Sequence, residues 1–173
     1  MEKRTEAILF WGLFAFYLLL LIDVVFLSRM SAGRSIRLVN LIPFQSILSY
    51  IHVDDGIRYR LVDVNIWGNI LMFVPMGIYV PLIRKKSTFL QTLLCLVILS
   101  FLIESVQYLF FLGSADIDDV VLNATGGVLG WLFYRLLLVF GKSLERTKRI
   151  VVVLSIVVGI PVFLLSILLF VVN

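Results

Sequence analysis

Seven polar side chains of the sequence stand in or beside long apolar stretches. They are carboxylates and carboxamides, which can bind a polar ligand, hold a cation or transfer a proton: Asn40, Asn69, Glu104, Gln107, Asp116, Asp119 and Asn123. A charged group at the centre of a membrane helix costs about 2.5 to 3.5 kcal/mol on insertion scales, which disfavours lipid-facing positions. We therefore expect the seven side chains to face inward and to form one polar pocket.

The spacing of these residues supports a shared site. At about 100° per residue, Asp116, Asp119 and Asn123 fall within roughly 60° of one another on a helix. Glu104 and Gln107 are an i, i+3 pair, so they also share a face. A rise of about 1.5 Å per residue places the intramembrane members and a further acid, Asp23, roughly 6 to 12 Å below the outer surface. The pocket should therefore open outward.

Each of these residues also has a plain structural interpretation. Asp116 with Asp119 three residues later is typical of a helix N-cap. Asp118 is expected to point away from the face that Asp116 and Asp119 share. Gly126 and Gly130 are spaced to let two helices approach closely. Asn69 and Asn123 can simply exchange hydrogen bonds between helices, each contributing about 0.6 kcal/mol on average.

The composition indicates the class of protein. The chain has 173 residues, of which 61% are hydrophobic, and its mean hydropathy is +1.09. This predicts an integral membrane protein and excludes a large soluble catalytic domain. The single cysteine, Cys95, provides neither a disulfide framework nor a Cys-based metal site. The basic residues form short groups without interleaved aromatic residues, so we expect no nucleic-acid partner.

Five apolar runs are long enough to cross a hydrocarbon core of about 30 Å: 7–27, 66–83, 89–112, 117–140 and 150–172. We predict an all-α, polytopic membrane helix bundle of about five transmembrane helices, forming a single domain over 1–173. Basic residues gather at the N-terminus and in the connections 84–86 and 142–149. The positive-inside rule then predicts an N-in/C-out orientation.

Residues 28–65 are too long for a turn and include a short apolar stretch, 38–48. This stretch is too short to span, so we predict an interfacial or re-entrant segment after the first helix. Arg34 and Arg37 are candidates for contacts with lipid head groups or phosphates. A lid over the pocket and a plain surface loop remain alternatives. The lone His52 lacks metal-ligand spacing to other residues, so we expect no metal site and no cofactor.

Four motifs, in order, resemble those of the VanZ family. They are NLIPF at 40–44, GNILMFVPMG at 68–77, ESVQ at 104–107 and DIDDVVLNATGG at 116–127. The resemblance covers 38–138 and leaves the helix predicted at 150–172 outside. Each motif alone is short, but four in this order are specific. Many family members carry an arginine shortly before DIDD, whereas Gly113, Ser114 and Ala115 stand there in this chain.

The resemblance implies a multi-pass protein of the bacterial plasma membrane. The family takes its name from a teicoplanin-resistance protein, and its members are associated with lower susceptibility to glycopeptide and lipoglycopeptide antibiotics. Teicoplanin-type drugs carry an acyl tail and act at the outer leaflet. We therefore expect a non-enzymatic resistance factor whose partners are membrane lipids and either the drug or a lipid-linked cell-wall precursor.

Two alternatives remain open at this stage. A metal-dependent membrane enzyme acting on a lipid-linked envelope precursor would use Glu104, Asp116 and Asp119 as ligands or as acid and base. The sequence holds no Ser-His-Asp set and no phosphate-binding loop, which makes an enzyme the less favoured hypothesis. A proton-coupled transporter ranks lower, because the acids are confined to the outer half and no inverted repeat is visible. The glycine stripe also permits a homo-oligomer.

Overall fold

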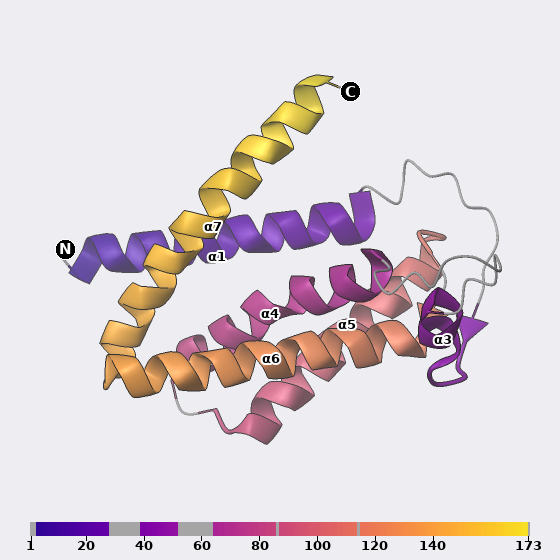
Figure 1. The fold of residues 1–173 in the computed structure, drawn as a ribbon, viewed down its shortest axis with the longest axis horizontal. Coiled ribbons are helices and arrows are strands. Elements are labelled where there is room, and N and C mark those ends of the chain that lie inside the picture. The colour runs from indigo at the N-terminus through magenta and orange to yellow at the C-terminus, as the bar shows by residue number, and fades with distance from the viewer. Residues whose placement is uncertain (1–2, 28–38, 52–63, 86, 114, 173) are drawn as a thin grey trace. The chain divides into compact units, whose positions relative to one another are not determined.

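The computed structural model describes residues 3–27, 39–51, 64–85, 87–113 and 115–172. Five of the described helices are long and apolar enough to cross a membrane, which confirms the predicted all-α membrane bundle. The orientation in the membrane and the single domain remain predictions. The elements in chain order are α1 (Lys3–Ile22) with a π-helical turn (Asp23–Leu27), β1 (Val39–Asn40), α3 (Gln45–Ile51), α4 (Val64–Arg84), α5 (Phe89–Leu109), β2 (Ala115–Asp116), α6 (Ile117–Gly141) and α7 (Leu144–Val172) (Figure 1).

The end of α5 differs from the prediction made from hydropathy. The helix ends at Leu109 rather than at residue 112. Phe111 adopts a left-handed φ of 58°, and the N–H of Leu112 donates back to the carbonyl oxygen of Gln107 at 2.8 Å. This is a Schellman arrangement, which commonly has glycine at the left-handed position. Because a phenylalanine takes that position here, the apolar run continues past the helix end.

The chain forms two compact units, and one of them, Leu21–Tyr134, contains the polar residues of interest. In this unit α4, α5 and the first part of α6 pack side by side (Figure 1). A Cβ atom added to Gly126 or Gly130 would overlap the backbone carbonyl oxygen of Ile70 or Val74 on α4. The predicted role of these glycines in close helix packing is therefore confirmed, and it brings the polar face of α6 against its neighbours.

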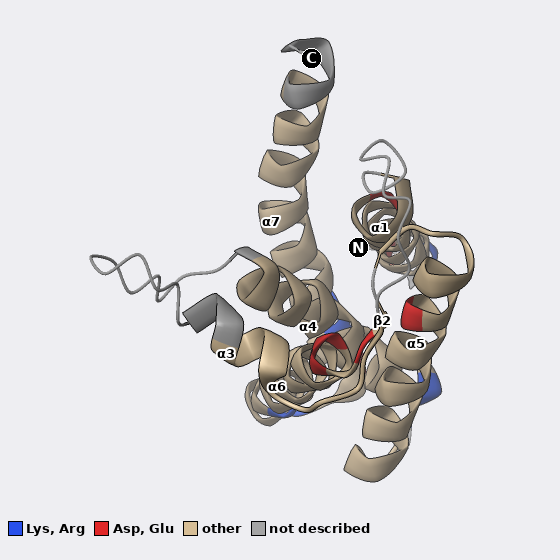
Figure 2. Ribbon diagram, turned by 90° about the vertical axis from the view of Figure 1, so that its right-hand side faces the viewer, with Lys and Arg blue, Asp and Glu red and all other residues tan. Residues whose placement is uncertain are grey.

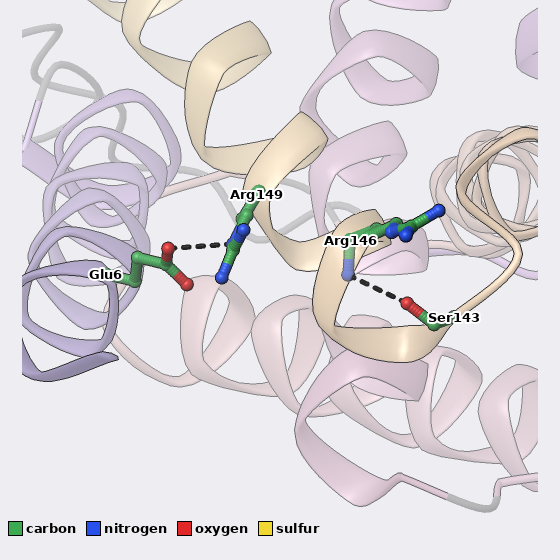
Figure 3. A network of polar contacts seen from close by, with 4 residues as sticks. All are labelled: Glu6, Ser143, Arg146 and Arg149. Atoms are coloured by element: carbon green, nitrogen blue, oxygen red, sulfur yellow. Dashed lines mark hydrogen bonds and ion pairs between the residues drawn. The ribbon is translucent and has the colours of Figure 1, made fainter. Parts of the chain in front are cut away.

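The other unit comprises Met1–Leu20 and Arg135–Asn173. Its helix α7 begins at Leu144 rather than at 150, because Ser143 caps it by accepting the N–H of Arg146 on Oγ at 3.3 Å (Figure 3). Arg149 Nε lies 2.7 Å from Glu6 Oε1 (Figure 3). The starts of α1 and α7 thus lie at the same end of this unit, which agrees with their predicted location on one side of the membrane.

The segment 39–51, between the first two long helices, is joined to the start of α6. β1 pairs with β2 in parallel, with Val39 opposite Ala115 and Asn40 opposite Asp116. α3 follows directly after a turn in which Phe44 takes a φ of 67°. The side chains of this turn are apolar and exposed, as suits an interfacial segment, although its depth in the membrane remains a prediction.

Candidate functional site

Asp116 connects the 39–51 segment, α5 and α6. One carboxylate oxygen accepts the N–H of Asp118 at 2.9 Å and Nδ2 of Asn40 at 3.1 Å. The other oxygen accepts the hydroxyl of Ser46. The backbone N–H of Asp116 donates to Glu104 Oε2 on α5 at 3.0 Å. The predicted N-cap role of Asp116 is confirmed, and the same side chain also anchors the neighbouring segment.

Asp118 holds the start of α3. Its carboxylate accepts three backbone N–H groups, from Phe44 at 2.5 Å, Ser46 at 2.8 Å and Ile47 at 3.1 Å. The side chain is 0% exposed. Asp118 was expected to point away from the stripe of Asp116, but its carboxylate accepts the N–H of Ser46, whose hydroxyl donates to Asp116, so both acids hold the same segment. The sequence analysis omitted Asp118 from the site, because helix periodicity gives a direction without showing what lies there.

Asn69 and Asp119 form a separate pair between α4 and α6. Asn69 Nδ2 donates to Asp119 Oδ1 at 2.6 Å. Asn69 is buried and Asp119 is half-buried. A carboxamide donor thus stabilises a carboxylate between two packed helices, and a hydrogen bond to a charged group contributes more than one between neutral groups.

The two remaining carboxamides, Gln107 and Asn123, are the most deeply buried members of the predicted set, at 2% and 3% exposed. Gln107 Nε2 donates to the backbone carbonyl of Val25 at 3.0 Å, and Asn123 Nδ2 donates to Ser100 Oγ at 2.9 Å. The sequence analysis missed both partners. The sequence did indicate Ser100 as a possible partner, since it lies four residues before Glu104 on the same face of α5. Nothing in the sequence indicated the Val25 carbonyl as a partner of Gln107.

The expectation for Asp23 is wrong, because its side chain is exposed. The chain makes a π-helical turn over Asp23–Leu27, which changes the angular register of the residues that follow. Val25, at 3% exposed, therefore lies on the buried side in its place. Arg34 and Arg37 lie outside the described residues, so their contacts with head groups or phosphates remain predictions.

The site is rich in oxygen and in negative charge. Its acids are Glu104, Asp116, Asp118 and Asp119, and Figure 2 shows acidic positions in red where β2 meets α6 and on α5. The described basic residues of this unit are Arg84 and Lys85, and Arg84 is about 22 Å along α4 from Asn69. Among the residues that the structure describes, no three Asp, Glu, His or Cys side chains form a metal-binding group.

Comparison with known proteins gives the family. A model of the family VanZ/LLP1 matches residues 14–139. The chain belongs to the VanZ family. Protein VanZ from Enterococcus faecium is 31% identical to it over 130 residues, which make up 72% of this chain and 73% of that protein. No solved structure matches the chain. This VanZ-like chain is therefore a multi-pass bacterial membrane protein.

The VanZ/LLP1 match includes all seven predicted site residues, as well as Asp118 and Ser100, and it ends before α7. Within this VanZ-like chain, hydrogen bonds join Asn40, Asp116 and Glu104 into one network. Asn69 donates to Asp119, whereas Gln107 and Asn123 donate to residues outside the predicted set. The seven residues, with Asp118 and Ser100, are called the polar cluster below.

Proposed function

We propose that this VanZ-like protein contributes to teicoplanin and lipoglycopeptide resistance, acting at the outer leaflet through the polar cluster and without catalysing a reaction. The observation that carries this proposal is the likeness to Protein VanZ of Enterococcus faecium over most of both chains. The family takes its name from a teicoplanin-resistance protein, and the four motifs that carry the resemblance supply every member of the cluster except Ser100.

The arrangement of the 39–51 segment supports an amphipathic ligand. Asp116 and Asp118 hold this segment at the start of α6. Its turn exposes apolar side chains: Leu41 is 71% exposed, Ile42 62% and Phe44 55%. Polar groups beside an exposed apolar surface suit a ligand with a polar head and an acyl tail. A lipoglycopeptide drug and a lipid-linked cell-wall precursor both have this character.

The alternative of a metal-dependent enzyme receives less support from the geometry. Asp116 and Asp118 use their carboxylate oxygens to hold the backbone and side chains of the 39–51 segment. Carboxylate oxygens that already accept several donors of the protein are less available to a substrate or a cation. An enzyme would also change an envelope lipid chemically, so lipid profiles of cells with and without the protein separate the two hypotheses.

The test is antibiotic susceptibility of a susceptible Gram-positive host, with and without the protein at verified expression levels. We expect the inhibitory concentration of teicoplanin to rise several-fold and that of vancomycin to rise less. An unchanged value for both drugs at full expression contradicts the proposal.

A pair of matched variants connects this activity to the polar cluster. Glu104→Gln keeps the size of a buried side chain and removes its charge, and we expect it to abolish protection. Asp23→Asn makes the same kind of change at an exposed position, and it should retain protection. Full protection by Glu104→Gln, at expression equal to wild type, contradicts the assigned role of the cluster.

A further inference from the structure

Two buried oxygen atoms of the polar cluster have no hydrogen-bond donor among the described residues. They are Gln107 Oε1 on α5 and Asn123 Oδ1 on α6. Their side chains are 2% and 3% exposed, so bulk water does not reach them. A buried polar group without a partner costs roughly 1 to 3 kcal/mol, and more where the surroundings are lipid. Two such groups close to one buried acid indicate a ligand.

Rotating either carboxamide does not remove the problem. Each amide nitrogen already donates, Gln107 Nε2 to the Val25 carbonyl and Asn123 Nδ2 to Ser100 Oγ. Exchanging nitrogen and oxygen would direct the Gln107 oxygen at another carbonyl oxygen, which cannot donate. For Asn123 the exchange would leave a buried amide nitrogen unpaired instead. In both orientations, one end of each side chain therefore lacks a partner within the part of the chain that the structure describes.

Gln107 and Ser100, the partner of Asn123, lie on the same face of α5 as Glu104, which is 6% exposed. Gln107 is three residues further along α5, a rise of about 4.5 Å. Ser100, which holds Asn123, is four residues before Glu104, a rise of about 6 Å. Glu104, Gln107 and Ser100 therefore place a carboxylate, one carbonyl oxygen and a hydroxyl on α5, and Asn123 adds a second carbonyl oxygen from α6. The described bases of the same unit are at the opposite end of α4.

We propose that the inner face of α5 around Glu104 binds a monovalent alkali cation, with the side-chain oxygens of Gln107 and Asn123 as neutral ligands. An all-oxygen set suits a hard cation. One buried carboxylate and one monovalent cation together are neutral, which is the favourable balance where solvation is poor. This inference goes beyond the proposed function and does not rest on it.

The test is thermal unfolding of the full-length protein in non-ionic detergent, in sodium, potassium or choline chloride at equal ionic strength. Choline is too large to enter a site made of packed side chains, so it serves as the reference salt. A ligand that binds the folded state raises the unfolding temperature as its concentration rises. We expect a saturable increase with sodium or potassium relative to choline. An equal unfolding temperature in all three salts overturns the proposal and indicates water or another part of the chain as the partner.

Variants locate the site. Gln107→Leu and Asn123→Leu remove the unpaired oxygen and keep the approximate volume, but they also remove the bonds donated to the Val25 carbonyl and to Ser100 Oγ. Both should therefore unfold at a lower temperature than the wild type in choline, and the cation response of each variant is measured relative to its own value in choline. We expect at least one of them, and Glu104→Gln, to lose most of the cation response. The control is Thr125→Val, whose exposed hydroxyl donates within α6, to the Val121 carbonyl at 2.8 Å.

A response that persists in both leucine variants overturns the proposal, and so does one that is also lost in Thr125→Val. If Glu104→Gln fails to fold, the leucine variants still decide the result. Resistance plays no part in this measurement, so failure here and failure of the proposed function are distinguishable.

Discussion

Two glutamates, one in each unit of the chain, differ in the surroundings that stabilise their negative charge. Glu6, in the unit that contains α7, pairs with Arg149, whose side chain is 51% exposed. Glu104, in the unit of the polar cluster, is 6% exposed and receives the backbone N–H of Asp116. Glu6 itself is 18% exposed, so water and salt screen the first interaction in part, and it contributes modestly to stability. The second is shielded, so its loss leaves buried polar groups unsatisfied. The buried acids should therefore determine how well the segment 39–51 is held.

The largest expected effect is that of Asp118→Ala. The change removes the acceptor of three backbone N–H groups at the start of α3. We expect the free energy of unfolding to fall by about 3 kcal/mol or more, measured by denaturation of the purified protein in micelles. Hydrogen exchange should accelerate at the amides of residues 44, 46 and 47. Asp23→Ala, at an exposed position, should change neither quantity, and unaltered exchange in Asp118→Ala would contradict the role of this carboxylate.

Two glycine-to-alanine substitutions, one in each unit, compare how closely the helices pack at the two positions. Gly130→Ala places a methyl group against the Val74 carbonyl on α4, and overpacking of this kind costs about 2 kcal/mol. Gly12→Ala, in α1, meets no atom within 4 Å and should raise the free energy of unfolding by up to about 1 kcal/mol through helix propensity. Equal effects of the two substitutions would show that the close approach of α4 and α6 is not needed for stability.

A smaller effect is expected for the pair Asn69 and Asp119. We expect a double-mutant cycle with alanine at both positions to give a coupling free energy of about 1 kcal/mol, within the range seen between membrane helices. The cycle isolates the 2.6 Å hydrogen bond from the other contacts of each residue. Additive single substitutions would mean that this hydrogen bond contributes nothing.

The smallest effect is expected at the half-exposed ion pair of Glu6 and Arg149. A cycle of Glu6→Gln and Arg149→Gln should give a coupling of about 0.3 to 0.5 kcal/mol. Because salt screens exposed charges, the coupling should fall towards zero at about 1 M sodium chloride. The coupling of Asn69 with Asp119 should persist in the same salt. A salt-resistant pair of Glu6 and Arg149 would remove the contrast between the two units.

The sequence by itself determined the membrane class, the five spans and the inward position of most of the polar residues. Insertion into a bilayer depends on the length and composition of each local segment, which the sequence states directly. Helix periodicity correctly predicted that Glu104 and Gln107 share a buried face, and the glycine spacing predicted the close packing of α6. The one failure of this method among the acids, Asp23, occurs where a π-helical turn breaks the regular period.

Only the tertiary structure decided the partners of these residues. The N–H of Phe44 is 74 residues from Asp118 in the chain, and nothing in the period of either segment indicates that they meet. The bonds of Gln107 to the Val25 carbonyl and of Asn123 to Ser100 Oγ are also long-range. Local free energies select a helix and its buried face. The partner on that face depends on how separate segments pack, which is a property of the whole chain.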